Sequence, residues 1–202
     1  MEDLMSGVRR LFLAVLVSVI ATLPVSAQEA ASSLSLSVHG GFINSPADFD
    51  ADRTVDVGSG VSFGGRLALQ LYERLSIRGE VGFTSGSGTD TTGGINEEIS
   101  LDRSFYGGGV EILLTTRSNV EPYVYLGGGL VVVDRTGATE LSYSYDVTEF
   151  SGVGGLGVRY VFRSGAFVFV DGTSYIYNNA ITDSAQKDGS LSVGFGYRWG
   201  GN

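Results

Sequence analysis

The sequence predicts an all-β protein, an eight-stranded antiparallel up-and-down transmembrane β-barrel. Successive segments alternate between apolar residues and small or polar residues, as strands do when their two faces meet different surroundings. The connections between these segments are alternately long and short, which is typical of barrels that cross a membrane. The last segment is a strand at the chain's end, and pairing it with the first strand would close the barrel.

A signal peptide is predicted at residues 1–27. Arg9 and Arg10 precede an apolar run at residues 11–23, and Val25-Ser26-Ala27 fits a cleavage site. The run is shorter than the roughly 20 residues that a membrane-spanning helix needs. We therefore expect an exported barrel domain at residues 28–202, with no further domain after it.

The composition narrows the possible functions. The chain has no cysteine, so we expect neither a disulfide framework nor a lipid-bearing cysteine. Its net charge of −9 makes nucleic acid a poor partner. The 31 glycines suit tightly curved strands in a narrow barrel.

The first four strands are expected at residues 34–43, 57–72, 75–84 and 99–114. Each combines an apolar face with a small or polar face, and the apolar faces include Val38, Phe63, Ile77 and Val110. Long polar loops are expected at residues 44–56 and 85–98. The turn between the second and third strands is short, at residues 73–74.

The other four strands are expected at residues 122–133, 147–162, 166–177 and 190–199. Pro122 is tolerated at a strand start, and Leu156 and Val158 mark the apolar face of the sixth strand. The seventh alternates least well, because Phe167 and Phe169 share a face with Asp171. Short turns are expected at residues 115–121 and 163–165, and long loops at 134–146 and 178–189.

The closing strand carries the clearest family resemblance. One face is wholly apolar or aromatic, with Leu191, Val193, Phe195, Tyr197 and Trp199. This strand resembles the final strand of bacterial outer-membrane β-barrel proteins, and the whole pattern resembles the small, eight-stranded OmpA-like barrels. The resemblance implies a Gram-negative outer-membrane location, contact with outer-membrane lipids and lipopolysaccharide, and a terminal aromatic segment that the barrel-insertion machinery reads.

Aromatic residues gather near the predicted short turns. Tyr72, Tyr160, Phe162, Tyr197 and Trp199 lie where an interfacial aromatic girdle belongs.

Charged residues recur on the polar faces of the strands. If the apolar faces meet lipid, these charges point inward and must pair, because isolated buried charges are costly. They are Arg66, Arg78, Glu80, Glu111, Arg159, Asp171 and Arg198. We expect them to form a salt-bridged network that closes the barrel; the alternative is a gate whose pairs exchange to open a narrow pore.

No catalytic, cofactor or metal site is predicted. His39 is the single histidine, and its parity places it inside, where we expect a hydrogen-bonding role. A hydrolytic barrel would need a serine paired with it, and Gly40 and Gly41 follow instead. Residues 48–52 begin like a calcium loop, but Arg53 and Ser59 occupy the required Gly and Glu positions.

The loops hold most of the acidic residues. We expect a solvated outer rim; the alternative is weak binding of divalent cations that bridge the rim to lipopolysaccharide.

The leading interpretation is a non-enzymatic outer-membrane barrel with a structural or surface-interaction role. One alternative is a small gated pore for ions or slender solutes. A second is a soluble lipocalin-like barrel that turns its apolar faces inward to bind lipid. The four arginines, which would then stud the outside, count against the second alternative.

Overall fold

In the computed structural model, the described residues are 33–45, 48–50, 53–56, 58–92, 95–116, 118–137, 145–179 and 184–200. Over these ranges the regular secondary structure is entirely β. None of the described segments is a helix long and apolar enough to cross a membrane.

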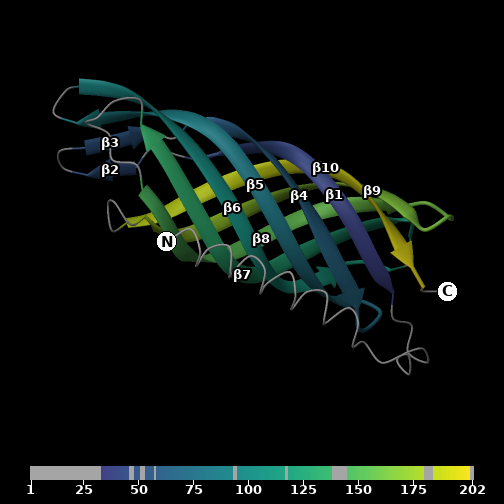
Figure 1. The fold of residues 1–202 in the computed structure, drawn as a ribbon. Helices are drawn as coiled ribbons and strands as arrows, with labels where there is room; N and C mark the ends of the chain where they lie inside the picture. Colours follow the sequence, from purple (N-terminus) through teal and green to yellow (C-terminus); the bar gives the residue numbers. More distant parts are fainter. Residues whose placement is uncertain are drawn as a thin grey trace, which may run out of the picture.

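Eight strands form the barrel, and a short hairpin stands at one end of it (Figure 1). The barrel strands are β1 (Leu34–Asn44), β4 (Ser59–Gln70), β5 (Leu75–Thr92), β6 (Ile95–Leu113), β7 (Val120–Gly137), β8 (Tyr145–Val161), β9 (Ala166–Asn179) and β10 (Ser184–Trp199). The hairpin consists of β2 (Asp48–Asp50) and β3 (Arg53–Asp56), and β3 pairs with β5. All pairings are antiparallel.

The first and last barrel strands close the sheet. β1 pairs with β10 from Leu34 opposite Trp199 to Asn44 opposite Gly189, while its other edge pairs with β4. Each barrel strand thus has a partner on both sides, and the terminal strand has no free edge that could aggregate. The predicted eight-stranded barrel is confirmed.

The apolar faces of the strands point outward. Phe42, Leu126, Leu156 and Phe195 are each more than 65% exposed, whereas the polar faces are buried in the interior. Large apolar side chains are exposed on every barrel strand, which makes a surface suited to hydrocarbon. The soluble, lipid-binding barrel with its apolar faces inside was therefore the wrong alternative.

Aromatic side chains cluster near the short turns, as expected. The rings of Tyr160 and Phe162 lie 5.0 Å apart, and so do those of Tyr197 and Trp199. Tyr72 is 71% exposed.

The strand ends near the short turns lie within two residues of the predicted ends, but the opposite ends differ greatly. The loop predicted at residues 85–98 is wrong: β5 continues to Thr92 and β6 begins at Ile95. Strand also occupies parts of the other long loops predicted at residues 44–56, 134–146 and 178–189. We call the end of the barrel that carries these extensions and the β2–β3 hairpin the outer end.

A reversal of polarity explains the long extensions. In the outer part of β6, Ile99 and Leu101 are buried inside, and Ser100 and Asp102 are exposed outside. β7 behaves alike, with Val131 and Val133 inside and Asp134 outside. This is the pattern of a barrel wall in water, and a search for apolar outer faces therefore misses it.

Candidate functional site: the interior charge network

The interior charges come from seven barrel strands, from β4 to β10. Strand side chains alternate between the two faces, so the polar face of each strand points into the lumen. Arg66, Arg78, Glu80, Glu111, Arg159 and Asp171 are all buried, and Arg198 is partly buried at the short-turn end. An eighth member, Glu121 at the start of β7, is buried beside them.

Four of these residues form the half of the network nearest the short turns. Arg198 Nη2 lies 2.6 Å from Glu121 Oε2, and the same carboxylate oxygen accepts a hydrogen bond from Arg159 Nε at 2.8 Å. Arg159 Nη2 then donates to Glu111 Oε1 at 2.6 Å. Each arginine is thus linked to the next through a carboxylate.

The other four residues continue the chain deeper into the barrel. Glu111 Oε2 lies 3.4 Å from Arg78 Nη1, and Arg78 also donates to Glu80. Glu80 Oε2 accepts from Arg66 Nε at 3.2 Å, and Arg66 forms a two-bond ion pair with Asp171.

Positive and negative charges alternate along the whole network. Four arginines and four carboxylates, in the order Arg198–Glu121–Arg159–Glu111–Arg78–Glu80–Arg66–Asp171, make it formally neutral. Burying one of these charges alone would cost several kcal/mol. The alternation gives every buried charge at least one opposite neighbour.

Aromatic side chains pack against the network. The guanidinium carbon of Arg78 lies 4.0 Å from the ring centre of Tyr125, and that of Arg66 lies 4.9 Å from that of Phe169. The Tyr123 hydroxyl donates to Asp171 Oδ2 at 2.7 Å. These rings fill the lumen around the charges and add cation–π contacts.

Phe167 and Phe169 fit the barrel because glycines lie beside them. They face Gly196 and Gly194 on the neighbouring strand β10, and a Cβ at either glycine would collide with the facing ring. The weak alternation of β9 therefore reflects two phenylalanines that point into the lumen.

The outer half of the lumen is mostly apolar. A buried cluster comes from β6 to β9, and its members are Ile99, Leu101, Phe105, Tyr125, Val131, Val133, Val153 and Tyr177. Beside it, Arg103 Nη1 reaches 3.2 Å from Asp188 Oδ2. Side chains thus occupy the lumen of the described barrel at both levels and leave small cavities between them.

The sequence reasoning missed three interior charges. Glu121 falls in the turn predicted at residues 115–121 and Asp188 in the loop predicted at residues 178–189, while Arg103 lies in the strand predicted at residues 99–114 but outside the predicted network. Glu121 shares its parity with Tyr123 and Tyr125, so extending the strand by one residue before Pro122 would have placed it inside.

His39 lies inside the barrel, as its parity predicts. Its Nε2 is 3.9 Å from Glu80 Oε1, too far for a hydrogen bond, and its Nδ1 has no hydrogen-bond partner among the described residues. The expected hydrogen-bonding role therefore stays a prediction.

The described residues include no group of three or more His, Asp or Glu side chains that could hold a metal ion. Part of the rejected calcium-loop segment forms β2, and residues 51 and 52 lie outside the described ranges.

A closed barrel with an apolar outer belt and an ion-paired lumen defines the class of integral outer-membrane β-barrel proteins. A model of the family described as outer membrane protein beta-barrel domain matches residues 13–198, and the chain belongs to this family. No curated protein matches the sequence.

Solved structures share the fold at low sequence identity. Neisserial surface protein A is 14% identical with a TM-score of 0.52, over 84% of this chain and 98% of that one. The outer membrane protein OprG from Pseudomonas aeruginosa is 13% identical with a TM-score of 0.54, over 85% and 97%. Ail, the attachment invasion locus protein of Yersinia pestis, is 14% identical with a TM-score of 0.51, over 83% and 99%; its structure holds the heparin analogue sucrose octasulfate.

Proposed function

We propose that this protein is a closed, non-enzymatic outer-membrane barrel with a structural or surface-interaction role. The observation that carries the proposal is the continuous charge network, which crosses the lumen below the apolar cluster. An ion would have to separate several buried pairs and then pass apolar side chains. Both steps oppose conduction.

Single-channel recording in planar bilayers tests the closed state. The folded protein is verified beforehand by its heat-modifiable migration on a gel. We expect no discrete openings from the wild-type chain. Openings that change in Glu80→Gln or Glu111→Gln, and stay the same in the exposed control Glu98→Gln, would instead make the protein a gated pore.

A non-enzymatic role is supported by the surroundings of His39. Within the described part of the chain, its Nδ1 has no hydrogen-bond partner, so no serine is activated by that nitrogen. Purified protein is expected to leave phospholipid and lipopolysaccharide acyl esters intact; their hydrolysis by the wild-type protein but not by His39→Gln would overturn the proposal.

We further propose that surface recognition occurs at the outer end, where β2, β3, β5 and β6 extend the sheet beyond the apolar belt. We expect partners at the outer end to differ in charge from the polysulfated, negatively charged ligand in the Ail structure. Asp102 lies directly opposite Asp134, and both are exposed on the outer face. Such a surface repels a polysulfated ligand and favours a basic partner, or lipopolysaccharide bridged by divalent cations.

Calorimetric titration with sucrose octasulfate tests the sign of this surface. We expect no binding heat from the wild-type protein. Binding that equals that of the double variant Asp102→Lys and Asp134→Lys would contradict the proposed charge preference.

Insertion is proposed to depend on the closing strand, through Leu191, Val193, Phe195, Tyr197 and Trp199. These residues are exposed on the lipid-facing side of β10, where an insertion machine could contact them. Residues 1–27 are proposed to be the signal peptide and lie outside the described ranges.

A further inference from the structure

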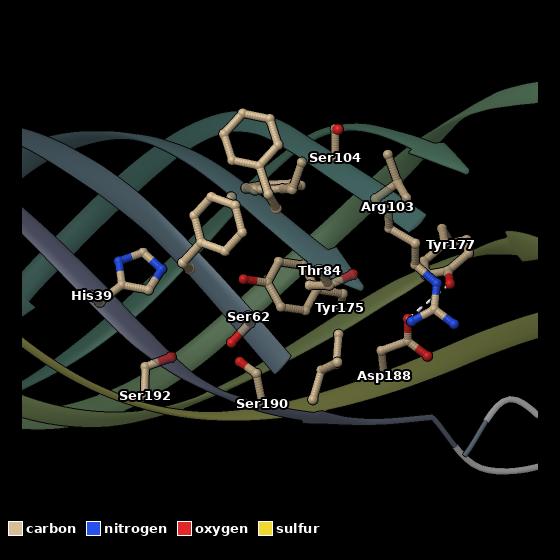
Figure 2. A pocket seen from close by; sticks show the side chains of 16 residues that line it. His39, Ser62, Thr84, Arg103, Ser104, Tyr175, Tyr177, Asp188, Ser190 and Ser192 are labelled. Carbon is tan, nitrogen blue, oxygen red and sulfur yellow. Dashed lines mark hydrogen bonds and ion pairs between the residues drawn. The ribbon is translucent and has the colours of Figure 1, made fainter. Parts of the chain in front are cut away.

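A small cavity lies in the outer half of the lumen, between the charge network and the Arg103–Asp188 ion pair (Figure 2). Figure 2 shows His39 at one end of the cavity and the ion pair at the other, with Ser62, Tyr175 and Ser190 between them. The cavity has room for about two water molecules.

The sequence creates this space with a row of small inward-facing residues. Ser192, Gly41, Ser62 and Thr84 lie directly opposite one another across β10, β1, β4 and β5. The next residue in the row is Arg103 on β6, opposite Thr84. The side chains on one wall of the cavity are therefore small and mostly polar. Phe105, Val131 and Tyr177 of the apolar cluster line the other side.

Three of the residues that line the cavity each carry a buried polar atom with no hydrogen-bond partner among the described residues. These atoms are His39 Nδ1, Ser62 Oγ and Arg103 Nε. An unpaired buried polar atom costs roughly 1–3 kcal/mol, and water can satisfy it where the space is polar and large enough. The convergence of three such atoms on one cavity points to bound water, although apolar side chains line much of its wall.

The outer closure of the cavity is a pair that spans the barrel. Arg103 on β6 reaches Asp188 on β10, and its Nη1 also donates to Ser45 Oγ at 2.9 Å. Asp188 also accepts from Tyr177 at 2.8 Å and from Gln186 at 3.0 Å. On the opposite side, His39 lies beside Glu80, which is held by Arg66 and Arg78.

We propose that this cavity is a chamber for bound water, reached from the outer end of the barrel alone. The Arg103–Asp188 pair is its closure, and the layer of His39, Arg66 and Glu80 is its floor. The chamber takes small hydrogen-bonding molecules of the size of water. The proposal rests on the closed barrel proposed above, because a conducting lumen would have no floor.

Cysteine accessibility tests the chamber, because the native chain has no cysteine. Ser62→Cys reports on the chamber, and Ser37→Cys reports on a second small cavity on the other side of the floor, which Ser37, Arg66 and Phe169 line. Folded protein is treated with methyl methanethiosulfonate, a small neutral thiol reagent. Ser190→Cys replaces Ser62→Cys as the reporter if that variant does not fold.

We expect the thiol at position 62 to react slowly in the native background and roughly tenfold faster or more when Asp188→Asn weakens the closure. Asp102→Asn, which removes an exposed outward carboxylate, is the matched control and should leave the rate unchanged. The thiol at position 37 should be unaffected by Asp188→Asn. An unchanged reaction rate at position 62 would show that the Arg103–Asp188 pair does not close the chamber. A faster reaction at both positions would show that the layer of His39, Arg66 and Glu80 does not separate the two cavities.

These outcomes are separable from a failure of the closed barrel. A conducting barrel would show openings in bilayers and rapid reaction at both positions without Asp188→Asn. A crystal structure is expected to show water within hydrogen-bond distance of His39 Nδ1, Ser62 Oγ and Arg103 Nε. A chamber without ordered water would contradict the assignment of its ligand.

Discussion

Arg198 and Glu121 form a bidentate ion pair at the short-turn end of the barrel, with Nη1 3.0 Å from Oε1 and Nη2 2.6 Å from Oε2. The two residues are 77 positions apart in the sequence. The pair joins the last strand of the barrel to β7, which is not its neighbour in the sheet. It therefore braces the lumen where the apolar cluster does not reach.

Replacing the carboxylate of this pair should destabilise the barrel. Glu121→Gln removes a negative charge that serves both Arg198 and Arg159. We expect a loss of about 2–4 kcal/mol in unfolding free energy, somewhat below a fully buried pair because Arg198 is partly exposed. Urea unfolding in lipid vesicles, followed by tryptophan fluorescence, measures it. The exposed control Glu98→Gln should change stability by less than about 0.5 kcal/mol; equal effects would show that the network adds nothing.

Two glycine positions should respond differently to the same added methyl group. Gly194→Ala places a Cβ against the Phe169 ring and the Val38 carbonyl, so we expect a cost of roughly 1–3 kcal/mol. Gly152→Ala places a Cβ on the outer face with nothing closer than 3.9 Å, and should be nearly neutral. Equilibrium unfolding of both variants checks the difference. Comparable losses at the two sites would contradict the packing of Phe169 over β10.

The apolar belt should reject charge, and the outer extension should accept it. Leu156 is 68% exposed on the belt, and Leu156→Arg should cost about 2–4 kcal/mol in a bilayer. Ser100, exposed on the outer part of β6, is the matched position, and Ser100→Arg should leave stability unchanged. The fraction of each variant that folds into lipid vesicles measures how well the bilayer accepts the added charge. A tolerated arginine at position 156 would mean that this face does not meet lipid.

The closing strand should affect insertion more than stability. Trp199 lies opposite Leu34 at the seam of the barrel, and its ring is 5.0 Å from that of Tyr197. If the insertion machinery reads this segment, Trp199→Ala should slow folding into vesicles that contain the machinery, with little change in vesicles without it. Tyr160→Ala removes another exposed aromatic near the short turns, away from the closing strand, and serves as the control. Equal slowing in both kinds of vesicle would remove the proposed signal role.

The sequence predicted the part of the barrel that lies in the belt, because there the alternation has one consistent direction. It failed at the outer end for a physical reason: in β6, Ile112 and Val110 point outward while Ile99 and Leu101 point inward. Small residues from Ser85 onward then suggested a loop, although the pairing of β5 with β6 continues to Thr92.

The charge network, too, could be predicted from the sequence only in part. Parity places Arg66 and Asp171 on the faces opposite the apolar residues, and therefore in the lumen once those residues meet lipid, but it cannot pair them. They come from β4 and β9, which are not adjacent in the sheet, and their contact depends on the tilt and stagger of all the strands. Local patterns contain no information on contacts across the lumen.

The reversal of polarity within β6 and β7 fixes the depth at which the barrel sits in its bilayer. Moving the protein inward by one pair of residues would bring Asp102 and Asp134 towards the hydrocarbon, and moving it outward would lift Leu130 and Tyr106, on the outer side of the belt, towards water. Both displacements are opposed by the same two strands. The height of the outer end above the lipid surface is therefore set by the sequence of the strands themselves.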